Sequence, residues 1–362
     1  MLIKYLEIFL LSLVGGWLFS LAHMPLPWTL GPLATVAVVK LVFRRQAYWP
    51  AKLRSYAFLL LGYAMGSPFT PETGQQLVAQ LPAMSVITLL TIVLCLVGGY
   101  IVGRFLDISP ATSLLGSLPG GLTQMAAVCE EVGEADEAAV TLMQTVRVLT
   151  VVFIVPFLVL HGLADRVDPV NRAAAVLSLG DIPSLLIFVA VIAGLFGLLR
   201  LLRAPNPFLI APIVGTAGLV LSGVHPPPLP YPVVALAQVF VGIRMGMAVE
   251  VSSLSNWKKM LLLNFACVFL VIAAFFGIDY VMSRLTPISF LTAFISTAPG
   301  GMAEMGLTAM MVHADLSTVV AFQMFRLLTV ILVAVPLVRW WLRREGKPLL
   351  GCRDNTRYLD DE

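Results

Sequence analysis

The sequence predicts an all-α, multi-pass membrane protein built from two inverted repeats of about five transmembrane helices, each containing a Pro-Gly-Gly broken or re-entrant helix. Three observations predict it: long uncharged apolar runs, motifs that recur at a constant spacing, and basic residues that gather on one side. Of the 362 residues, 59% are hydrophobic and 12% are charged, so the chain carries more apolar surface than one soluble core could bury. Lipid must therefore cover the excess.

Uncharged runs long enough to cross a hydrocarbon layer about 30 Å thick recur along the chain. They cover residues 8–39, 85–103, 182–199, 260–278 and 287–303. We expect several of these runs to be membrane spans, with the lipid bilayer as the main partner of the chain.

Composition also argues against several function classes. The net charge is +3 and the basic residues are scattered through short connections, so we expect no nucleic-acid partner. The four cysteines are widely separated, and the four histidines lack ligand spacing. We therefore expect no disulfide, no metal and no cofactor.

Four groups of residues recur about 180 positions apart, which predicts a duplication. The first-half members are Pro25, Pro27 and Pro32; Gly62, Met65 and Gly66; Pro119, Gly120, Gly121 and Met125; and Gln144, Arg147, Leu149 and Thr150. Their counterparts are Pro205, Pro207 and Pro212; Gly242, Met245 and Gly246; Pro299, Gly300, Gly301 and Met305; and Gln323, Arg326, Leu328 and Thr329.

Each copy contains the same elements in the same order. A leading helix is followed by a helix that opens with Pro-x-Pro, a short Gly-x-x-Met-Gly helix and a long apolar helix. A Pro-Gly-Gly break and a final helix with Gln-x-x-Arg complete the copy. We therefore expect a first membrane repeat over residues 1–164, a polar linker over 165–180, a second repeat over 181–345 and a short cytoplasmic tail over 346–362.

The distribution of Lys and Arg predicts the orientation of the copies. With a cytoplasmic N-terminus and five crossings per copy, the Pro-Gly-Gly segments dip in and return, and nearly every basic cluster lies in the cytoplasm. These clusters are Arg44, Arg45, Lys52 and Arg54; Arg104; Arg200 and Arg203; Lys258 and Lys259; and Arg339, Arg343, Arg344 and Lys347. If the Pro-Gly-Gly segments crossed fully, two clusters of the second copy would lie outside. An odd number of crossings inverts the second copy, as in secondary transporters, and leaves both termini in the cytoplasm.

The Pro-Gly-Gly breaks are the first candidate site. Backbone groups without partners cost several kcal/mol each in hydrocarbon, so a break there needs protein or water around it. Two inverted copies would bring the turns at Pro119, Gly120 and Gly121 and at Pro299, Gly300 and Gly301 together near the midplane. The helix that follows each turn has free N–H groups that favour an anion. The alternative is tight helix packing, which we expect for the Gly-x-x-Met-Gly helices.

The final helices carry the second candidate site, Gln144 and Arg147 in the first copy and Gln323 and Arg326 in the second. Apolar residues follow both arginines, so the guanidinium groups are expected to enter the membrane and to face a cavity or a partner. Each arginine could bind a carboxylate or phosphate bidentately. Equally, each could bind backbone carbonyls that the broken helix frees.

The copies differ after the break, where Gln124 corresponds to Glu304. A carboxylate at this position is a candidate for proton or cation coupling, or for pairing with an arginine. Arg244 and Asp279 are weaker candidates, because either side chain could reach a nearby interface.

The segments Leu30-Gly31-Pro32, Gly116-Ser117-Leu118-Pro119-Gly120-Gly121 and Gln144-x-x-Arg147-x-Leu149, repeated in the second half, resemble the AbrB family of duplicated bacterial inner-membrane proteins. The resemblance covers almost the whole chain. It implies labels of gene regulation, for an alkylation-response gene, and of ammonia monooxygenase activity. The chain has neither the clustered ligands of an oxygenase nor a soluble basic module.

The family is also similar in layout to the cation antiporters, bile-acid transporters and 2-hydroxycarboxylate transporters. This chain lacks the paired-aspartate motif of the antiporters, which argues against sodium/proton exchange.

We therefore predict a secondary transporter of a small anionic organic solute, in the bacterial inner membrane, that works by alternating access. The alternative is a membrane-bound regulator of gene expression that acts through a partner or through the level of an effector. We expect no enzymatic activity, because no nucleophile and base are arranged for it. The sequence leaves open the solute, the coupling ion, the direction of transport and the oligomeric state, and a homo-oligomer is compatible with it.

Overall fold

The computed structural model describes residues 2–45, 48–120, 125, 128–129, 135–163, 181–202, 204–249 and 257–344. Within these ranges the chain is helical and has no strand. Six helices are long and apolar enough to cross a membrane, which confirms the prediction of a helical membrane protein. They cover Lys4–Leu21, Pro71–Leu106, Glu137–Leu163, Ile182–Leu201, Trp257–Leu285 and Leu316–Leu342.

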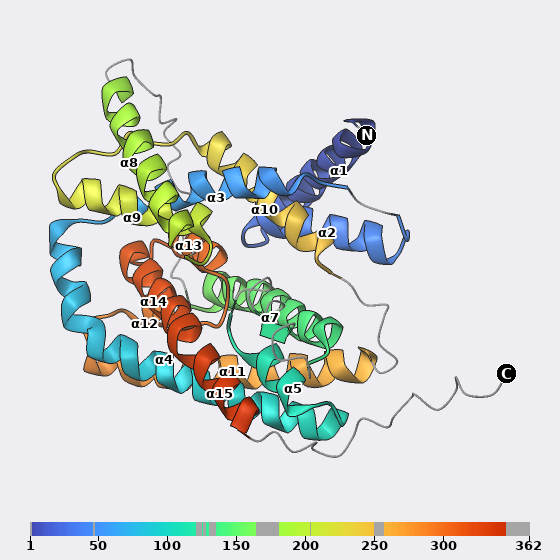
Figure 1. Cartoon of the computed structure of the whole chain (residues 1–362). Helices are drawn as coiled ribbons and strands as arrows, with labels where there is room; N and C mark the ends of the chain where they lie inside the picture. Colours follow the sequence, from blue (N-terminus) through green and yellow to red (C-terminus); the bar gives the residue numbers. More distant parts are fainter. Residues whose placement is uncertain are drawn as a thin grey trace.

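Six helices form a first layer, in the upper part of Figure 1. They are α1 (Leu2–Leu21), α2 (Pro27–Leu41), α3 (Ala51–Gly66), α8 (Ile182–Leu201), α9 (Pro207–Leu221) and α10 (Tyr231–Met247). In this layer α2 packs on α1 and α10, while α3 packs on α9 and α10. The helix α8 buries Phe188 alone among its side chains and packs on α9, so most of its surface is open to lipid.

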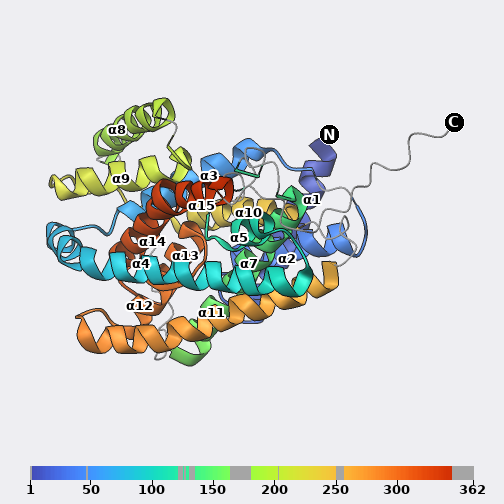
Figure 2. The same cartoon turned by 60° about the horizontal axis from the view of Figure 1, so that its bottom comes forward.

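The remaining helices form a second layer that contains both Pro-Gly-Gly segments. They are α4 (Pro71–Leu106), α5 (Pro110–Ser117), α7 (Glu137–Leu158), α11 (Trp257–Leu285), α12 (Phe290–Thr297), α13 (Met302–Met311), α14 (Leu316–Thr329) and α15 (Val335–Arg344). The π-helical turns η1 (Val159–Leu163) and η3 (Val330–Ala334) extend α7 and α14. Figure 2 shows the two longest helices, α4 and α11, running side by side, and they are also in contact.

Helix boundaries in the two halves repeat at one spacing. The first residues of α8, α9, α10 and α12 lie 180 positions after those of α1, α2, α3 and α5. The main contacts between the halves also have counterparts, which are found by replacing both helices with their equivalents in the other half. The helix α2 packs on α10 and α3 packs on α9, while α7 packs on α11 and α14 packs on α4.

Glycines allow the close contacts between the halves in the first layer. A Cβ atom on Gly62 of α3 would lie 2.5 Å from Pro212 Cγ of α9. A Cβ atom on Gly242 of α10 would collide with the carbonyl oxygen of Thr29 and lie 3.1 Å from Pro32 Cβ of α2. These contacts confirm the interpretation of the Gly-x-x-Met-Gly helices as packing surfaces.

Polar contacts between helix ends show which ends lie near one another. Lys40 Nζ, near the end of α2, donates to Met247 O at the end of α10, at 2.7 Å. Tyr63 Oη, near the end of α3, donates to Pro227 O, just before α10, at 2.7 Å. The end of α2 therefore lies beside the end of α10, while the end of α3 lies beside its start.

Candidate functional site

The second break begins at the C-terminus of α12, where Pro299 cannot continue the helix because it lacks an N–H group. A helix end leaves its last carbonyls without intrahelical partners. Two side chains of α14 bind them. Gln323 Nε2 donates to Ile295 O, Ser296 O and Ala298 O at 3.0 to 3.2 Å.

Arg326 completes this set of hydrogen bonds, and we call Gln323 and Arg326 together the second clamp. Its Nη1 donates to Thr297 O at 3.2 Å and to Ala298 O at 2.6 Å, and its Nη2 donates to Gly300 O at 2.8 Å. Nη2 also donates to Gln323 Oε1, which joins the two clamp residues. Both side chains are almost fully buried. The break is thus held from α14 over its whole length.

The first break is held in the same way by Gln144 and Arg147 of α7, which form the first clamp. Gln144 Nε2 donates to Leu115 O and Leu118 O, each at 2.8 Å. Arg147 Nη1 donates to Leu118 O at 2.6 Å, and its Nη2 donates to Gly120 O at 3.3 Å. Of the two roles that the sequence allows for the arginines, these bonds belong to the structural one, the binding of freed carbonyls.

The two clamps differ in what they leave without a partner. Gln144 Oε1 and Arg147 Nε are buried and form no hydrogen bond, whereas Gln323 Oε1 accepts from Arg326. The first clamp therefore keeps the amide oxygen of Gln144 available, whereas the second clamp uses the equivalent oxygen of Gln323. Gly121 and Gln124 lie outside the described residues.

The two ends of each broken segment meet. Asp136 N, at the start of α7, donates to Thr112 Oγ1 in the first turn of α5, at 2.9 Å. Asp315 N, at the start of α14, donates to Thr292 Oγ1 in the first turn of α12, at 3.2 Å. The two ends of each broken segment therefore lie close together.

The two clamps lie at the same distance along the two final helices. The clamp residues lie eight and eleven residues into the final helices, which is about 12 to 16 Å at 1.5 Å per residue.

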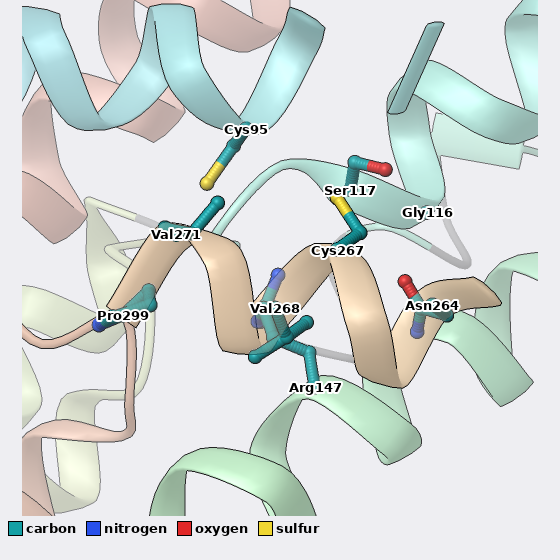
Figure 3. Close-up of a pocket in the computed structure, with 9 residues that line it drawn as sticks. All are labelled: Cys95, Gly116, Ser117, Arg147, Asn264, Cys267, Val268, Val271 and Pro299. Atoms are coloured by element: carbon teal, nitrogen blue, oxygen red, sulfur yellow. The ribbon is translucent and has the colours of Figure 1, made fainter. Parts of the chain in front are cut away.

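A small cavity lies between the segment before the first break and Pro299 of the second break (Figure 3). Its volume is about 20 Å³, enough for roughly one water molecule. It is lined by Cys95, Gly116, Ser117, Arg147, Asn264, Cys267, Val268, Val271 and Pro299. Residues before the first break and Pro299 of the second break share it, and Arg147 is the charged side chain in its lining.

Of the residues expected in the site, Arg147 and Pro299 line this cavity. Pro119 and Gly120 are buried in the first turn next to it, while Gly300 and Gly301 in the second turn are half-buried. Sequence reasoning missed the contributions of α4 and α11, namely Cys95, Asn264 and Cys267. Asn264 carries the one available signal, an amide in an apolar helix, and its Nδ2 donates to Met143 O at 2.7 Å.

Glu304 is buried but has a local role. It lies in the first turn of α13, where its carboxylate contacts Gly301, the N-cap residue, and accepts from its own backbone N–H. A carboxylate at this position stabilises a helix N-terminus. Arg54 of α3 interacts with it electrostatically.

The two weaker candidates, Arg244 and Asp279, differ in how far they are buried. Arg244 is half-buried near the end of α10. Asp279, in contrast, has no exposed surface and accepts a hydrogen bond from Thr297 Oγ1 at 2.7 Å. The expectation that its side chain reaches an interface is therefore wrong. Among the described residues, no three His, Cys, Asp or Glu side chains gather where they could hold a metal.

Comparison with known proteins places this architecture among bacterial relatives. The family described as "Transition state regulatory protein AbrB" matches residues 28–342. The chain is 28% identical to "Uncharacterized protein YhjN" of Bacillus subtilis (strain 168), covering 93% of both chains. It is 27% identical to "Putative regulator AbrB" of Escherichia coli (strain K12), covering 91% of this chain and 94% of the relative. No solved structure matches the chain.

Proposed function

Because the chain belongs to the AbrB family and is a helical membrane protein, we propose that it is a secondary transporter of a small anionic organic solute in a bacterial inner membrane. The observation that carries this proposal is a cavity lined both by residues just before the first break and by Pro299 of the second break. Interrupted helices that meet near the bilayer midplane are the usual construction of transporter binding sites.

The reciprocal helix contacts support an inverted arrangement. In the first layer α2 packs on α10, and their equivalents α9 and α3 pack on each other. An approximate two-fold axis relates these two contacts. The meeting ends of the broken segments support five crossings per copy. An odd number of crossings places the second copy upside down, with both termini in the cytoplasm.

The chemistry of the cavity favours an anion. Among the described residues, its charged lining residue is Arg147, a guanidinium whose Nε has no partner, and no carboxylate lines it. An organic solute needs more than the present volume, so the cavity has to widen when one half moves against the other.

The name of one relative, "Putative regulator AbrB", raises a second candidate, a membrane-bound regulator. A transporter that sets the level of an effector would also change gene expression, so the two functions are compatible. Deleting residues 346–362 separates them. A direct regulator would lose its regulatory effect while solute uptake stays unchanged, whereas a transporter would keep both. We expect no covalent chemistry in either case.

A stability screen on purified protein tests the proposal. A solute that binds the folded state raises the melting temperature in proportion to the logarithm of its concentration. We expect small carboxylates and phosphates to do so and amines of similar size not to. Hits would then be tested for uptake into proteoliposomes.

Two substitutions on α4 connect a hit to the cavity. Cys95→Met fills part of the cavity and should abolish both the stabilisation and the uptake. Val93→Met adds a similar side chain on the exposed face of the same helix, where Val93 is 45% exposed, and should leave both unchanged. Stabilisation by amines alone, or equal effects of the two variants, would refute the anion site.

A further inference from the structure

We propose that Asp279 is the site at which this protein binds and releases a coupling proton. The inference rests on the proposed transport function and names its coupling ion. Asp279 lies in α11, six residues before the helix ends, and its side chain has no exposed surface. An ionisable group inside a membrane segment is costly and normally functional.

The hydrogen bonds of Asp279 suit a group that changes its protonation state. Oδ2 accepts from Thr297 Oγ1 at 2.7 Å, while Oδ1 is buried and has no partner. Thr297 Oγ1 also lies 3.3 Å from Phe294 O. The hydroxyl has one hydrogen, so it can serve only one of these acceptors. When Asp279 is protonated, its own O–H can donate to Thr297, and the threonine can donate to Phe294 O.

The surroundings of Asp279 lack a paired charge. The structure joins no described basic side chain to it as an ion pair. The charged side chains on neighbouring elements include Arg284 on α11 itself, Arg147 on α7 and Arg326 on α14. Arg284 binds the Tyr280 hydroxyl, and the other two bind backbone carbonyls. Others lie near helix ends: Lys258 and Lys259 at the start of α11, Glu137 at the start of α7, and Glu72 and Arg104 in the first and last turns of α4.

The remaining elements packed on α11 present uncharged side chains here. The helix α12 has no charged residue, and the middle of α4 contributes Met84 and Ile87 to the same cluster as Phe275 and Met282 of α11. A metal cation would need further anionic oxygens as ligands, whereas a proton needs only this carboxyl. The surroundings of Asp279 therefore favour a proton as its ligand.

Asp279 is connected to the second break and through it to the cavity. It holds the hydroxyl of Thr297, while Arg326 holds the carbonyl of the same residue. Pro299, two residues further, lines the cavity. Loss or gain of the Asp279 proton thus changes a hydrogen bond at the start of the turn that borders the solute site.

An open groove lies beside this end of α11. Its volume is about 570 Å³, and it is lined by Phe276, Tyr280, Ser283, Arg284, Ser289 and Phe290. Proton binding forms one O–H bond at the carboxylate and takes one proton from water on one side. Release breaks that bond and returns the proton on the other side after the halves have moved.

The equivalent place in the first half has no room for a carboxylate. Gly99 occupies the position 180 residues earlier, and a Cβ atom on it would lie 2.5 Å from Ser117 Oγ and 2.7 Å from Ser117 Cβ. The proposed proton site is therefore specific to the second half, while the glycine contact holds the first break against α4.

Infrared spectroscopy of the purified full-length protein tests the inference without a known solute. We expect a protonated-carboxyl stretching band that changes with bulk pH, is absent in Asp279→Asn and shifts in frequency in Thr297→Val, which keeps the carboxyl. Asp107→Asn is the control, because Asp107 is exposed at the end of the matching helix α4 in a left-handed conformation that Asn tolerates.

The outcomes separate this inference from the transport function. A band that persists in Asp279→Asn and disappears in Glu304→Gln would overturn it, and so would a band that responds to sodium instead of pH. If a solute is transported and Asp279→Asn leaves the dependence of uptake on a pH gradient unchanged, the inference fails while transport stands. If no solute is found but the band titrates and is lost in Asp279→Asn, the proton site stands without the transport function.

Discussion

At the scale of single residues, two buried arginines compensate for the carbonyl groups that the helix breaks leave without partners. Each guanidinium binds the carbonyl oxygens of the residues before and after the proline of its turn, because its planar fork presents donors in two directions. The neighbouring glutamine binds the carbonyls one turn earlier. The Gln-x-x-Arg spacing therefore matches the pitch of the helix that it holds.

Arg326→Gln is predicted to lower the free energy of unfolding by about 2 to 4 kcal/mol, because each buried carbonyl left without a donor costs about 1 to 3 kcal/mol. Arg326→Lys should lie between this variant and wild type, since it keeps the charge but lacks the fork. Denaturant unfolding in detergent measures both.

The control for this series is Arg45→Gln. Arg45 pairs with Glu7 at 2.9 Å on the surface, where its side chain is 70% exposed. Exposed ion pairs contribute between about 0 and 1 kcal/mol, so this variant should be close to wild type. Equal losses in Arg45→Gln and Arg326→Gln would contradict the clamp.

At the scale of elements, helix pairs approach closely where glycine faces a backbone. In the first layer, Cβ atoms on Gly66 and Gly246 would lie 2.7 Å from Ile213 O and 2.6 Å from Leu33 O. In a membrane, such close packing takes the place of the hydrophobic driving force between soluble helices. These contacts join the two halves, so they determine how the halves can move.

Gly62→Ala and Gly242→Ala are predicted to destabilise the protein by about 1 to 3 kcal/mol each, the usual cost of overpacking a tight contact. Gly277→Ala is the matched control, because no other atom lies within 4 Å of a Cβ atom at that helical position. This control should be neutral or gain up to about 1 kcal/mol from helix propensity. Thermal unfolding of the three variants side by side checks the ranking, and a loss in Gly277→Ala equal to the others would refute the steric explanation.

The sequence was sufficient to predict the helical membrane class and to single out Arg147 and Arg326 as buried guanidinium groups. It could not decide what they bind, because the choice between a solute and a carbonyl depends on distances between elements far apart in the chain. It also missed Asn264 and the burial of Asp279. How deep a position in a 29-residue helix lies depends on the packing of α4, α12 and α14 around it.

At the scale of the whole molecule, the proposed inverted arrangement of the halves implies that equivalent positions lie on opposite sides of the membrane. Val42 follows α2 and Ser222 follows α9, 180 residues later, and both are exposed. Asp107 follows α4 and Pro287 follows α11 at the same spacing, and both are exposed as well.

Single cysteines at these positions, in a chain without its four native cysteines, test the orientation in intact cells. A membrane-impermeant maleimide should label Ser222→Cys and Pro287→Cys from outside, and should label Val42→Cys and Asp107→Cys only after the membrane is permeabilised. The positive-inside distribution predicts this assignment, since Arg44 and Arg45 lie next to Val42 and Arg104 lies next to Asp107. Labelling of both members of a pair from one side would mean that the halves run parallel, and the shared site at the midplane would then have no structural basis.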